Sequence, residues 1–368
     1  MNSRRRPRWP LVVLVNLLGI AAVLLAAEAT TRWRLAGSAG QGDDRLPMCR
    51  PDDTTIWRYR PDVTLDYRTP EFTMPVATNK DGLRSGPPPV AGQPVVLFIG
   101  DSFTFGWGVA PAQRFSELAA AAAGAPQFIN AGHWMYTFDQ QLVLLKELVR
   151  RWRPSVVVQG LYWPHVRTLL GHRLEHDSAG RLQAVRAPGL VVDAQGVLRH
   201  RSDWVDSPPL GSQLLAQAAR ALLNRDLQRQ AASWVEYMQP GRDKDGDLWA
   251  ETDALLGETL AFLRAEGVVW VPFLIPTSVE VGGDGWRHVG WFAAEPPSGV
   301  DVTLPARRLQ AMLERRGQPV LALAEPLRAA GGARLYFAED GHWNAAGHDA
   351  VAALLAPAIA RALPPTSR

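Results

Sequence analysis

The chain alternates between short, strongly apolar runs and longer segments with helical periodicity. Five apolar runs begin at residue 95: VVLFIG (95–100), QFINAG (127–132), SVVVQGLYW (155–163), GVVWVPFLIP (267–276) and the weaker QPVLALA (318–324). Helix-like segments such as FSELAAAAAG and QQLVLLKELVRRW follow the first two runs. Short β-branched runs that alternate with helices are typical of a parallel sheet covered on both faces. The pattern therefore predicts an α/β fold with a mainly parallel, five-stranded sheet.

A longer apolar stretch, WPLVVLVNLLGIAAVLLAA (9–27), follows four arginines at the N-terminus. At about 1.5 Å per residue, such a helix nearly spans a hydrocarbon core of about 30 Å. Arginine-rich flanks stay in the cytoplasm, so residues 1–28 are expected to form a cytoplasmic tip and a single-pass transmembrane anchor, with the remaining chain on the extracytoplasmic side of the cell membrane. The alternative is a cleaved signal peptide and a secreted protein, because Ala27-Glu28-Ala29 fits a small-x-small cleavage site.

The rest of the chain divides by composition. Residues 29–94 are rich in Pro, Asp and Arg and contain short β-like pieces, which indicates a stalk that merges into peripheral strands. Residues 95–363 form the expected α/β domain, with an insertion at about 166–253 that has a hairpin-like and a helical part. Because the insertion follows a strand end, where ligands bind in open α/β sheets, it is a candidate lid or specificity element. Residues 364–368 form a tail.

Composition and charge narrow the classes of function. The 368 residues are 47% hydrophobic and 20% charged, which suits globular domains and excludes disorder throughout. The net charge is +3, and the four N-terminal arginines account for this excess, so no nucleic-acid partner is predicted. The single cysteine, Cys49, excludes an intrachain disulfide and a zinc cluster built from cysteines.

A serine occupies the turn after the first apolar run, in the sequence GDSFTFG (100–106). Where a strand turns into a helix, the hydroxyl of Ser102 would lie at the carboxyl edge of the sheet. The helix N-terminus there stabilises developing negative charge. This placement suits a nucleophile, although Asp101 or Ser102 could instead only cap the helix.

The sequence DGHWNAAGH (340–348) supplies the groups that such a serine needs. A serine requires a general base, and a histidine base requires an acceptor at its other ring nitrogen. In an extended or turn segment, residues two apart project to the same side, so Asp340 can hold Nδ1 of His342 while Nε2 faces Ser102. The expected catalytic residues are therefore Ser102, His342 and Asp340, with no metal and no organic cofactor.

These motifs resemble the SGNH (GDSL-type) hydrolase superfamily, especially its bacterial membrane-anchored or exported branch. The resemblance rests on GDSFTFGWGV, FINAG followed by TFDQQL, VVVQGLYW, VPFLIPTSVEV and FAEDGHWNAAGH, with TNKDGLR ahead of them. It implies a three-layer, flavodoxin-like fold in which Ser102 is the nucleophile, His342 the base and Asp340 its orienting carboxylate. The G-x-S-x-G elbow of α/β-hydrolases is absent from the sequence.

The resemblance also implies three oxyanion donors: the N–H of the nucleophile, a glycine N–H in the second block and an asparagine in the third. Met135 stands where that glycine is expected, with Gly132 as a neighbouring alternative. The third block reads GLYWPHV and holds no asparagine, so the imidazoles of His165 and His133 are candidate donors.

Four tryptophans each lie within a few residues of a different motif block: Trp107, Trp134, Trp163 and Trp343. If the fold brings them to one edge of the sheet, they form an aromatic wall that suits sugar rings or acyl chains. Ordinary packing is the alternative for each. We expect at least two of them to line the active-site cleft.

Together these observations predict a serine-dependent ester hydrolase that acts on an acylated envelope glycan or a small ester. The first alternative is an O-acyltransferase that modifies an exported polysaccharide, which would need a membrane partner to deliver the acyl donor. The second alternative, motivated by the missing asparagine, is a catalytically weak glycan-binding or assembly module.

Overall fold

A computed structural model describes residues 9–37, 48–166, 173–187, 190–192, 198–200, 211–215, 218, 237–240, 246–282 and 298–365. Most of the helical part of the expected insertion lies outside these residues, as do the arginines of the N-terminal tip. The chain divides into two compact units. The smaller unit comprises Met1–Asp44 and Arg201–Leu227, and the larger comprises Arg45–His200 and Gln228–Arg368.

The smaller unit contains helix α1 (Trp9–Gly37). Within it, Val12–Trp33 has a mean hydropathy of 2.3 and is, among the described residues, the one helical stretch long and apolar enough to cross a membrane. Near the end of this stretch, the Glu28 carboxylate accepts hydrogen bonds from Ser212 Oγ at 2.8 Å and from the N–H groups of Gln213 and Leu214 at 2.9 Å. The start of a short helical segment is therefore capped by a residue of α1.

The larger unit is built on a five-stranded sheet with the order β13-β12-β7-β5-β6. Every neighbouring pair is parallel. The strands are β5 (Val95–Gly100), β6 (Gln127–Gly132), β7 (Val156–Tyr162), β12 (Val269–Ile275) and β13 (Leu321–Ala322). The strand order reverses at β5, because β6 lies on one side of it and the later strands lie on the other. In sheets of this order, ligands bind at the carboxyl ends of the strands beside the reversal.

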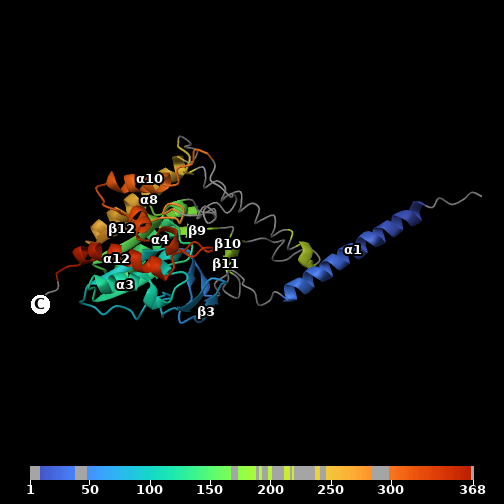
Figure 1. Ribbon diagram of the computed structural model, residues 1–368, viewed down its shortest axis with the longest axis horizontal. Helices are drawn as coiled ribbons and strands as arrows, with labels where there is room; N and C mark the ends of the chain where they lie inside the picture. The colour runs from blue at the N-terminus through green and yellow to red at the C-terminus, as the bar shows by residue number, and fades with distance from the viewer. Residues whose placement is uncertain are drawn as a thin grey trace, which may run out of the picture. The chain divides into compact units, whose positions relative to one another are not determined.

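Helices cover both faces of the sheet, as Figure 1 shows for the larger unit. One face packs against α3 (Phe115–Ala122) and α12 (Ala345–Ala362), and the other against α4 (Phe138–Trp152), α8 (Gly246–Ala265) and α10 (Leu304–Glu314). Successive β5 side chains alternate between the two cores. Val96 and Phe98 pack on the face covered by α3 and α12, and Leu97 and Ile99 on the face covered by α4, α8 and α10. The prediction of a three-layer α/β fold with a parallel five-stranded sheet is confirmed.

Shorter elements connect these layers. They are α2 (Ser102–Phe105), η1 (Pro111–Gln113), η2 (Trp163–Val166), α11 (Ala324–Ala330) and η4 (Gly332–Leu335). The described part of the expected insertion contains two antiparallel hairpins, formed by β8 (Arg173–His176) with β9 (Leu182–Arg186) and by β10 (Leu190–Val192) with β11 (Leu198–His200).

Of the segment that we expected to be a stalk merging into peripheral strands, residues 48–94 belong to the larger unit, and their buried apolar side chains join its core. These residues form two hairpins, β1 (Cys49–Asp52) with β2 (Ile56–Tyr59) and β3 (Thr64–Arg68) with β4 (Thr73–Ala77). Trp57, Tyr59 and Met74 are fully buried in the cluster that also contains β5 side chains. An isolated two-stranded hairpin is marginal in water, so these hairpins gain stability by burying one face against the sheet domain.

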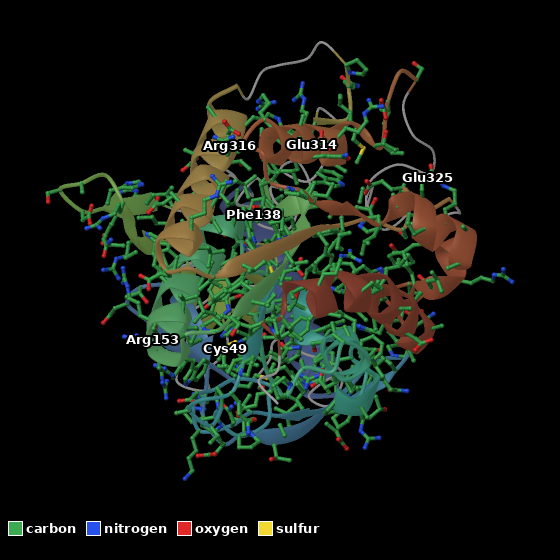
Figure 2. The ribbon with its side chains drawn as sticks, turned by 90° about the vertical axis from the view of Figure 1, so that its left-hand side faces the viewer. Cys49, Phe138, Arg153, Glu314, Arg316 and Glu325 are labelled. Carbon is green, nitrogen blue, oxygen red and sulfur yellow. The ribbon has the colours of Figure 1, made fainter. Side chains whose placement is uncertain are left out.

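In Figure 2, Phe138 lies near the centre of this unit and Arg153, Glu314 and Glu325 lie around its edge.

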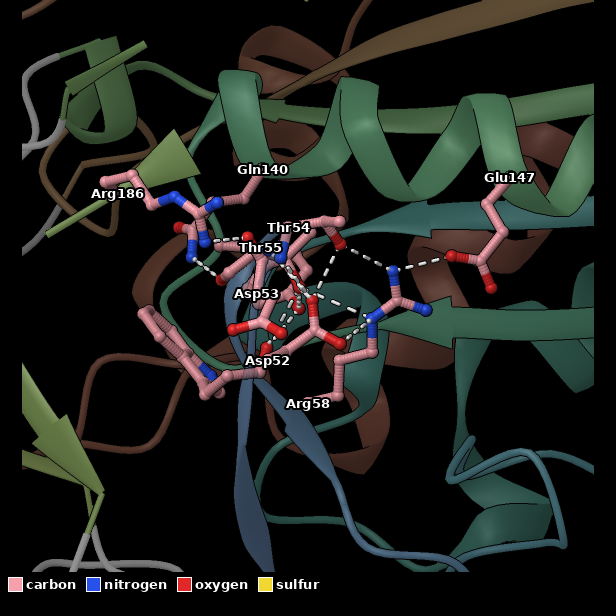
Figure 3. A network of polar contacts seen from close by, with 10 residues as sticks. Asp52, Asp53, Thr54, Thr55, Arg58, Gln140, Glu147 and Arg186 are labelled. Atoms are coloured by element: carbon pink, nitrogen blue, oxygen red, sulfur yellow. Dashed lines mark hydrogen bonds and ion pairs between the residues drawn. The ribbon is translucent and has the colours of Figure 1, made fainter. Parts of the chain in front are cut away.

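A polar network joins the first hairpin to α4 (Figure 3). Asp52 Oδ1 accepts hydrogen bonds from the N–H groups of Thr54 and Thr55, both at 2.9 Å. Asp52 Oδ2 lies 3.1 Å from Arg58 Nε, and Arg58 Nη2 lies 2.6 Å from Glu147 Oε2 on α4. Burial raises the pKa of Asp52, but hydrogen bonds from Thr54 and the charge of Arg58 outweigh it and bring the pKa to about 2. The Asp52 carboxylate therefore stays charged and fixes the hairpin turn.

Candidate active site

Ser102 is the first residue of α2, directly beyond the carboxyl end of β5. Asp101 caps this helix, because its Oδ1 accepts a hydrogen bond from the N–H of Phe103 at 3.0 Å. The turn packs closely against β6: a Cβ added to Gly132 would lie 2.1 Å from the backbone nitrogen of Phe105. A glycine at this position therefore lets the backbone of α2 approach the neighbouring strand.

The structure brings Ser102, His342 and Asp340 together. His342 Nε2 lies 2.7 Å from Ser102 Oγ, and His342 Nδ1 lies 2.6 Å from Asp340 Oδ1. Between the last two residues, Gly341 has a φ of +84°, a left-handed conformation that a glycine adopts without strain. A carboxylate at Nδ1 requires the proton on that nitrogen, which leaves Nε2 able to accept the serine proton.

Asp340 has a second hydrogen-bond donor in Trp107. The indole Nε1 donates to Asp340 Oδ2 at 3.0 Å, so each carboxylate oxygen has its own ring partner. Burial raises the pKa of Asp340, but hydrogen bonds from His342 and Trp107 outweigh burial and hold the pKa below its ordinary value. The carboxylate is therefore charged at neutral pH.

Glu71, in the turn between β3 and β4, holds the loop that carries Asp340. Its Oε1 accepts from the N–H of Glu339 at 3.0 Å, and its Oε2 accepts from the N–H of Asp340 at 2.7 Å. No local pattern predicts this role, because a single glutamate in a short turn resembles any solvated charge. The hairpin of β3 and β4 therefore supports the site from outside the sheet.

Arg84 supports the loop after Ser102. Its side chain is 1% exposed, and its Nη1 donates to the carbonyls of Phe105 at 3.0 Å and Gly106 at 2.7 Å, while Nη2 donates to the carbonyl of Val109 at 2.7 Å. Burial and the nearby charge of Arg114 lower the pKa of Arg84 to about 9. The segment TNKDGLR, which ends at Arg84, thus has a structural contact with the nucleophile loop.

Of the two backbone donors considered in the second block, Met135 is available and Gly132 is engaged. The N–H of Gly132 donates to Asn130 Oδ1 at 3.0 Å. Met135 has a φ of +55°, in the left-handed region that favours glycine, and no group in the described part of the chain accepts its N–H. Met135 therefore adopts a left-handed conformation at the position where a glycine was expected.

His133 lies in the core, with its side chain 1% exposed. Its ring stacks between Tyr59 and Tyr136, with ring centroids 4.6 and 4.4 Å away, and its Nδ1 lies 3.1 Å from the carbonyl of Ala131. Complete burial lowers the pKa of His133 to about 3, so the ring is neutral. Its packing explains its position, and the expectation of an imidazole donor at this residue does not fit the structure.

His165 lies beside the turn of the nucleophile. It belongs to η2, which follows β7, and its Nδ1 lies 3.2 Å from Asp101 Oδ2. Its ring meets that of Tyr162 edge to face, with centroids 5.2 Å apart. Both candidate histidines follow strand ends, His133 after β6 and His165 after β7, but only the side chain of His165 is partly exposed, at 16%.

The four tryptophans divide into two pairs. Trp107 stacks on Trp134 with ring centroids 6.3 Å apart, and Trp107 lies 5.9 Å from the ring of His342. Trp163 is 2% exposed and donates its Nε1 to Glu280 Oε2 at 3.1 Å. Trp343 is fully buried. The first pair lies beside the triad, where Trp107 is 5% exposed and Trp134 is partly exposed, and the second pair is packed in the interior.

Two rings of the β3–β4 hairpin, one on β3 and one in the turn, extend the aromatic cluster beside Trp107. Tyr67 and Phe72 have ring centroids 4.9 and 6.4 Å from that of Trp107, and Phe72 also packs on Phe337 at 4.8 Å. We did not predict these two rings, because they precede the first sheet strand in a segment without a long apolar run.

No cluster of three His, Cys, Asp or Glu side chains that could hold a metal occurs among the described residues.

The fold and these contacts define a three-layer α/β protein with a serine, histidine and aspartate relay at the carboxyl edge of its sheet. No family model matches the chain, and no curated protein matches it. Similar solved structures carry names of the GDSL and SGNH hydrolases, the superfamily that the motifs resemble.

Three of these structures illustrate the similarity. A GDSL-like lipase from Bacteroides thetaiotaomicron is 14% identical, with 76% of this chain and 93% of that chain covered and a TM-score of 0.39. A lipase/acylhydrolase from Enterococcus faecalis is 15% identical, covers 75% of this chain and 100% of its own, and has a TM-score of 0.42. An SGNH hydrolase, so described, from Slackia heliotrinireducens is 14% identical, with 73% and 100% covered and a TM-score of 0.36.

Proposed function

We propose that this protein is a serine esterase of the SGNH type. One observation carries the proposal: the chain of contacts from Ser102 Oγ to His342 Nε2 at 2.7 Å and from His342 Nδ1 to Asp340 Oδ1 at 2.6 Å. In the proposed reaction, Ser102 attacks an ester carbonyl while His342 takes its proton and then gives it to the leaving alcohol. Asp340 stabilises the imidazolium, and water then hydrolyses the acyl-enzyme.

Two backbone groups are proposed as oxyanion donors. They are the N–H of Ser102, at the start of α2, and the N–H of Met135. In the described part of the chain, neither N–H has an acceptor within the protein. A donor of this kind is typically worth about 10²–10³ in kcat.

The proposed substrate is an acylated envelope glycan or a small ester. The partly exposed rings of Trp134 and Tyr67, which pack on the buried Trp107 beside His342, support this class, because sugar rings and acyl chains both pack on aromatic faces. The apolar stretch of α1 supports a single-pass membrane anchor with the catalytic unit on the extracytoplasmic side.

The test uses the full chain in detergent, with hydrolysis of an aryl acetate and labelling by a fluorophosphonate probe. We expect both signals, and we expect Ser102→Ala and His342→Ala to abolish them. Ser178→Ala is the matched control, because Ser178 lies on the exposed hairpin of β8 and β9. A wild-type chain that is folded but neither labels nor hydrolyses would refute the esterase proposal and favour a binding or assembly module.

An O-acyltransferase is the second candidate, favoured by the burial of Ser102, which is 7% exposed. Exclusion of water lengthens the life of an acyl-enzyme and so allows a sugar hydroxyl to resolve it. Incubation with an acetyl ester, with and without an oligosaccharide, distinguishes the two: free acetate alone indicates hydrolysis and acetylated sugar indicates transfer. A transferase would also need a membrane partner that delivers the acyl donor.

A further inference from the structure

The turn that follows β6 has a conformation that normally requires glycine. The N–H of Tyr136 donates to the carbonyl of His133 at 3.2 Å, so Trp134 and Met135 are the two central residues of a β-turn. Met135 is the second of them and has a φ of +55°. Turns with a positive φ at this position favour glycine or asparagine, because the left-handed region is disfavoured by about tenfold for other residues. Contacts outside the turn must therefore offset the cost of this conformation.

The β1–β2 hairpin supplies such contacts at the start of the turn. The hydroxyl oxygen of Tyr59, at the end of β2, accepts a hydrogen bond from the N–H of Trp134 at 2.6 Å. The Tyr59 ring also stacks on the ring of His133, with centroids 4.6 Å apart and an angle of 12° between the planes. Both of these rings are buried. One side chain of the hairpin therefore holds the backbone of the turn and the side chain of its first residue.

The same hairpin holds the last residue of the turn. Tyr136 is fully buried, and its hydroxyl lies within hydrogen-bond distance of the carbonyl of Trp57 and 2.9 Å from Thr55 Oγ1. Its ring stacks on that of His133, with centroids 4.4 Å apart. Met135 thus lies between two turn residues that the hairpin fixes.

The turn begins beside the nucleophile. Gly100 and Gly132 are paired at the ends of β5 and β6. The N–H of the next residue, His133, donates to the carbonyl of Gly100 at 3.0 Å, two residues before Ser102. The conformation of the turn therefore determines which backbone groups face the carboxyl end of β5.

We propose that Tyr59 is a positioning residue, whose hydroxyl holds the His133–Tyr136 turn in the conformation that presents the N–H of Met135 to the oxyanion. This inference rests on the proposed esterase function, in which Met135 is a donor. As Ser102 Oγ bonds to the carbonyl carbon, the carbonyl π electrons move to oxygen, and the serine proton goes to His342 Nε2. The N–H of Met135 donates to that oxygen and keeps its proton, and the C=O bond reforms when the alcohol leaves.

The test is a double-mutant cycle in the full chain in detergent. Tyr59→Phe keeps the ring and removes the acceptor for the turn, whereas Met135→Gly keeps the N–H and removes the cost of the left-handed conformation. The single and double variants are compared by kcat and KM with an aryl acetate and by the rate of Ser102 labelling with a fluorophosphonate. Tyr237→Phe is the matched control, because Tyr237 is also buried but packs against Trp249 of α8.

We expect Tyr59→Phe to lower kcat by about five- to tenfold, a larger factor than any change in KM, because the turn loses a bond that offsets the conformation of Met135. Met135→Gly should stay within about threefold of the wild type. Tyr59→Phe added to Met135→Gly should then lower kcat by less than about threefold, because glycine adopts the turn without help. Tyr237→Phe should resemble the wild type.

A wild-type kcat in folded Tyr59→Phe overturns the inference and leaves the esterase function intact. An equal loss from Tyr59→Phe with and without Met135→Gly also overturns it, because a residue that only stabilises the core lowers kcat by the same factor in both backgrounds.

If Tyr59→Phe alone does not fold, the double variant decides. A folded double variant with the kcat of Met135→Gly supports the inference, since relief of the turn then replaces the hydroxyl. A double variant that stays unfolded, or folds with a much lower kcat than Met135→Gly, overturns it. A folded wild-type chain that neither labels nor hydrolyses refutes the esterase proposal, and this inference falls with it.

Discussion

Trp107 and His342 occupy opposite oxygens of one carboxylate: the indole N–H lies 3.0 Å from Asp340 Oδ2, and the imidazole Nδ1 lies 2.6 Å from Oδ1. Trp107 is also the centre of the aromatic surface, since it contacts Tyr67, Phe72 and Trp134. The surface proposed to bind the substrate and the relay proposed to activate the serine thus meet at Asp340.

Replacing Trp107 with phenylalanine keeps an aromatic ring and removes the N–H. A hydrogen bond to a charged group is worth about 1.5–3 kcal/mol, so we expect Trp107→Phe to lower kcat by about tenfold. Steady-state kinetics with an aryl acetate measure this effect. Trp152→Phe, on the far end of α4, is the control and should leave kcat unchanged. An unchanged kcat in Trp107→Phe would show that the indole hydrogen bond to Asp340 does not contribute to catalysis.

Replacing Asp340 with asparagine should be far more damaging. The amide group can donate to Nδ1, which would leave the proton of His342 on Nε2 and block its action as a base, so we expect kcat to fall by about 10⁴. Glu339→Gln changes the neighbouring exposed carboxylate and should have little effect. Similar losses in both variants would point to a general disturbance of the loop.

Glu71 gives a prediction about positioning. Glu71→Ala leaves the N–H groups of Glu339 and Asp340 without their carboxylate acceptor, so unfolding should become easier by about 1 kcal/mol. Because the loop carries Asp340 and His342, kcat should fall by a larger factor than any change in KM. Urea unfolding and steady-state kinetics measure the two effects. Glu71→Gln keeps one acceptor oxygen and should lie between the wild type and Glu71→Ala.

Glu280 predicts a pH-dependent stability. Burial raises its pKa from 4.5 to about 7 despite hydrogen bonds from Thr277 and Trp163. Between these values the folded state retains a proton that the unfolded state loses, so the free energy of unfolding falls as pH rises. The full difference is about 3 kcal/mol.

Glu280→Gln removes this titration. The stability advantage of Glu280→Gln over the wild type should therefore grow from pH 5 to pH 8, measured by urea unfolding of the full chain in detergent. A constant difference between the two proteins across this range would show that Glu280 is not the group responsible.

The parts of the fold that follow from local pattern were predictable from the sequence. The strands β5 and β6 have the bounds of their apolar runs, because each run is buried on both faces and ends at a glycine before a turn. At the opposite edge of the sheet from β6, β13 spans only Leu321–Ala322 within an apolar run of seven residues, so the length of that run does not give the length of the strand.

The N-terminal hairpins were less visible because their apolar side chains alternate singly with polar ones. Arg58 stands between Trp57 and Tyr59 in the sequence, so no apolar run marks this strand as part of a core. A sequence with this alternation fits a surface strand as well as one that packs on a domain.

The site divides in the same way. Ser102, Asp340 and His342 each belong to a motif that could be read locally, and the structure brings them within hydrogen-bond distance. Glu71 was not predictable, because its partner Asp340 is 269 residues away and no local pattern at the β3–β4 turn specifies that contact. The carboxylate of Asp101 had been considered only as a cap, and its contact with His165 depends on two strands that the chain order separates.

The burial of the first two hairpins determines where a shortened protein can begin. A chain started at Val95 would contain every strand of the sheet and all three relay residues. It would lack Arg84, which holds the loop after the serine, and Tyr59, whose ring packs on Phe105 of α2 and on His133. Expression without α1 therefore requires a start before Met48, since the boundary of autonomous folding lies well ahead of the boundary of the sheet.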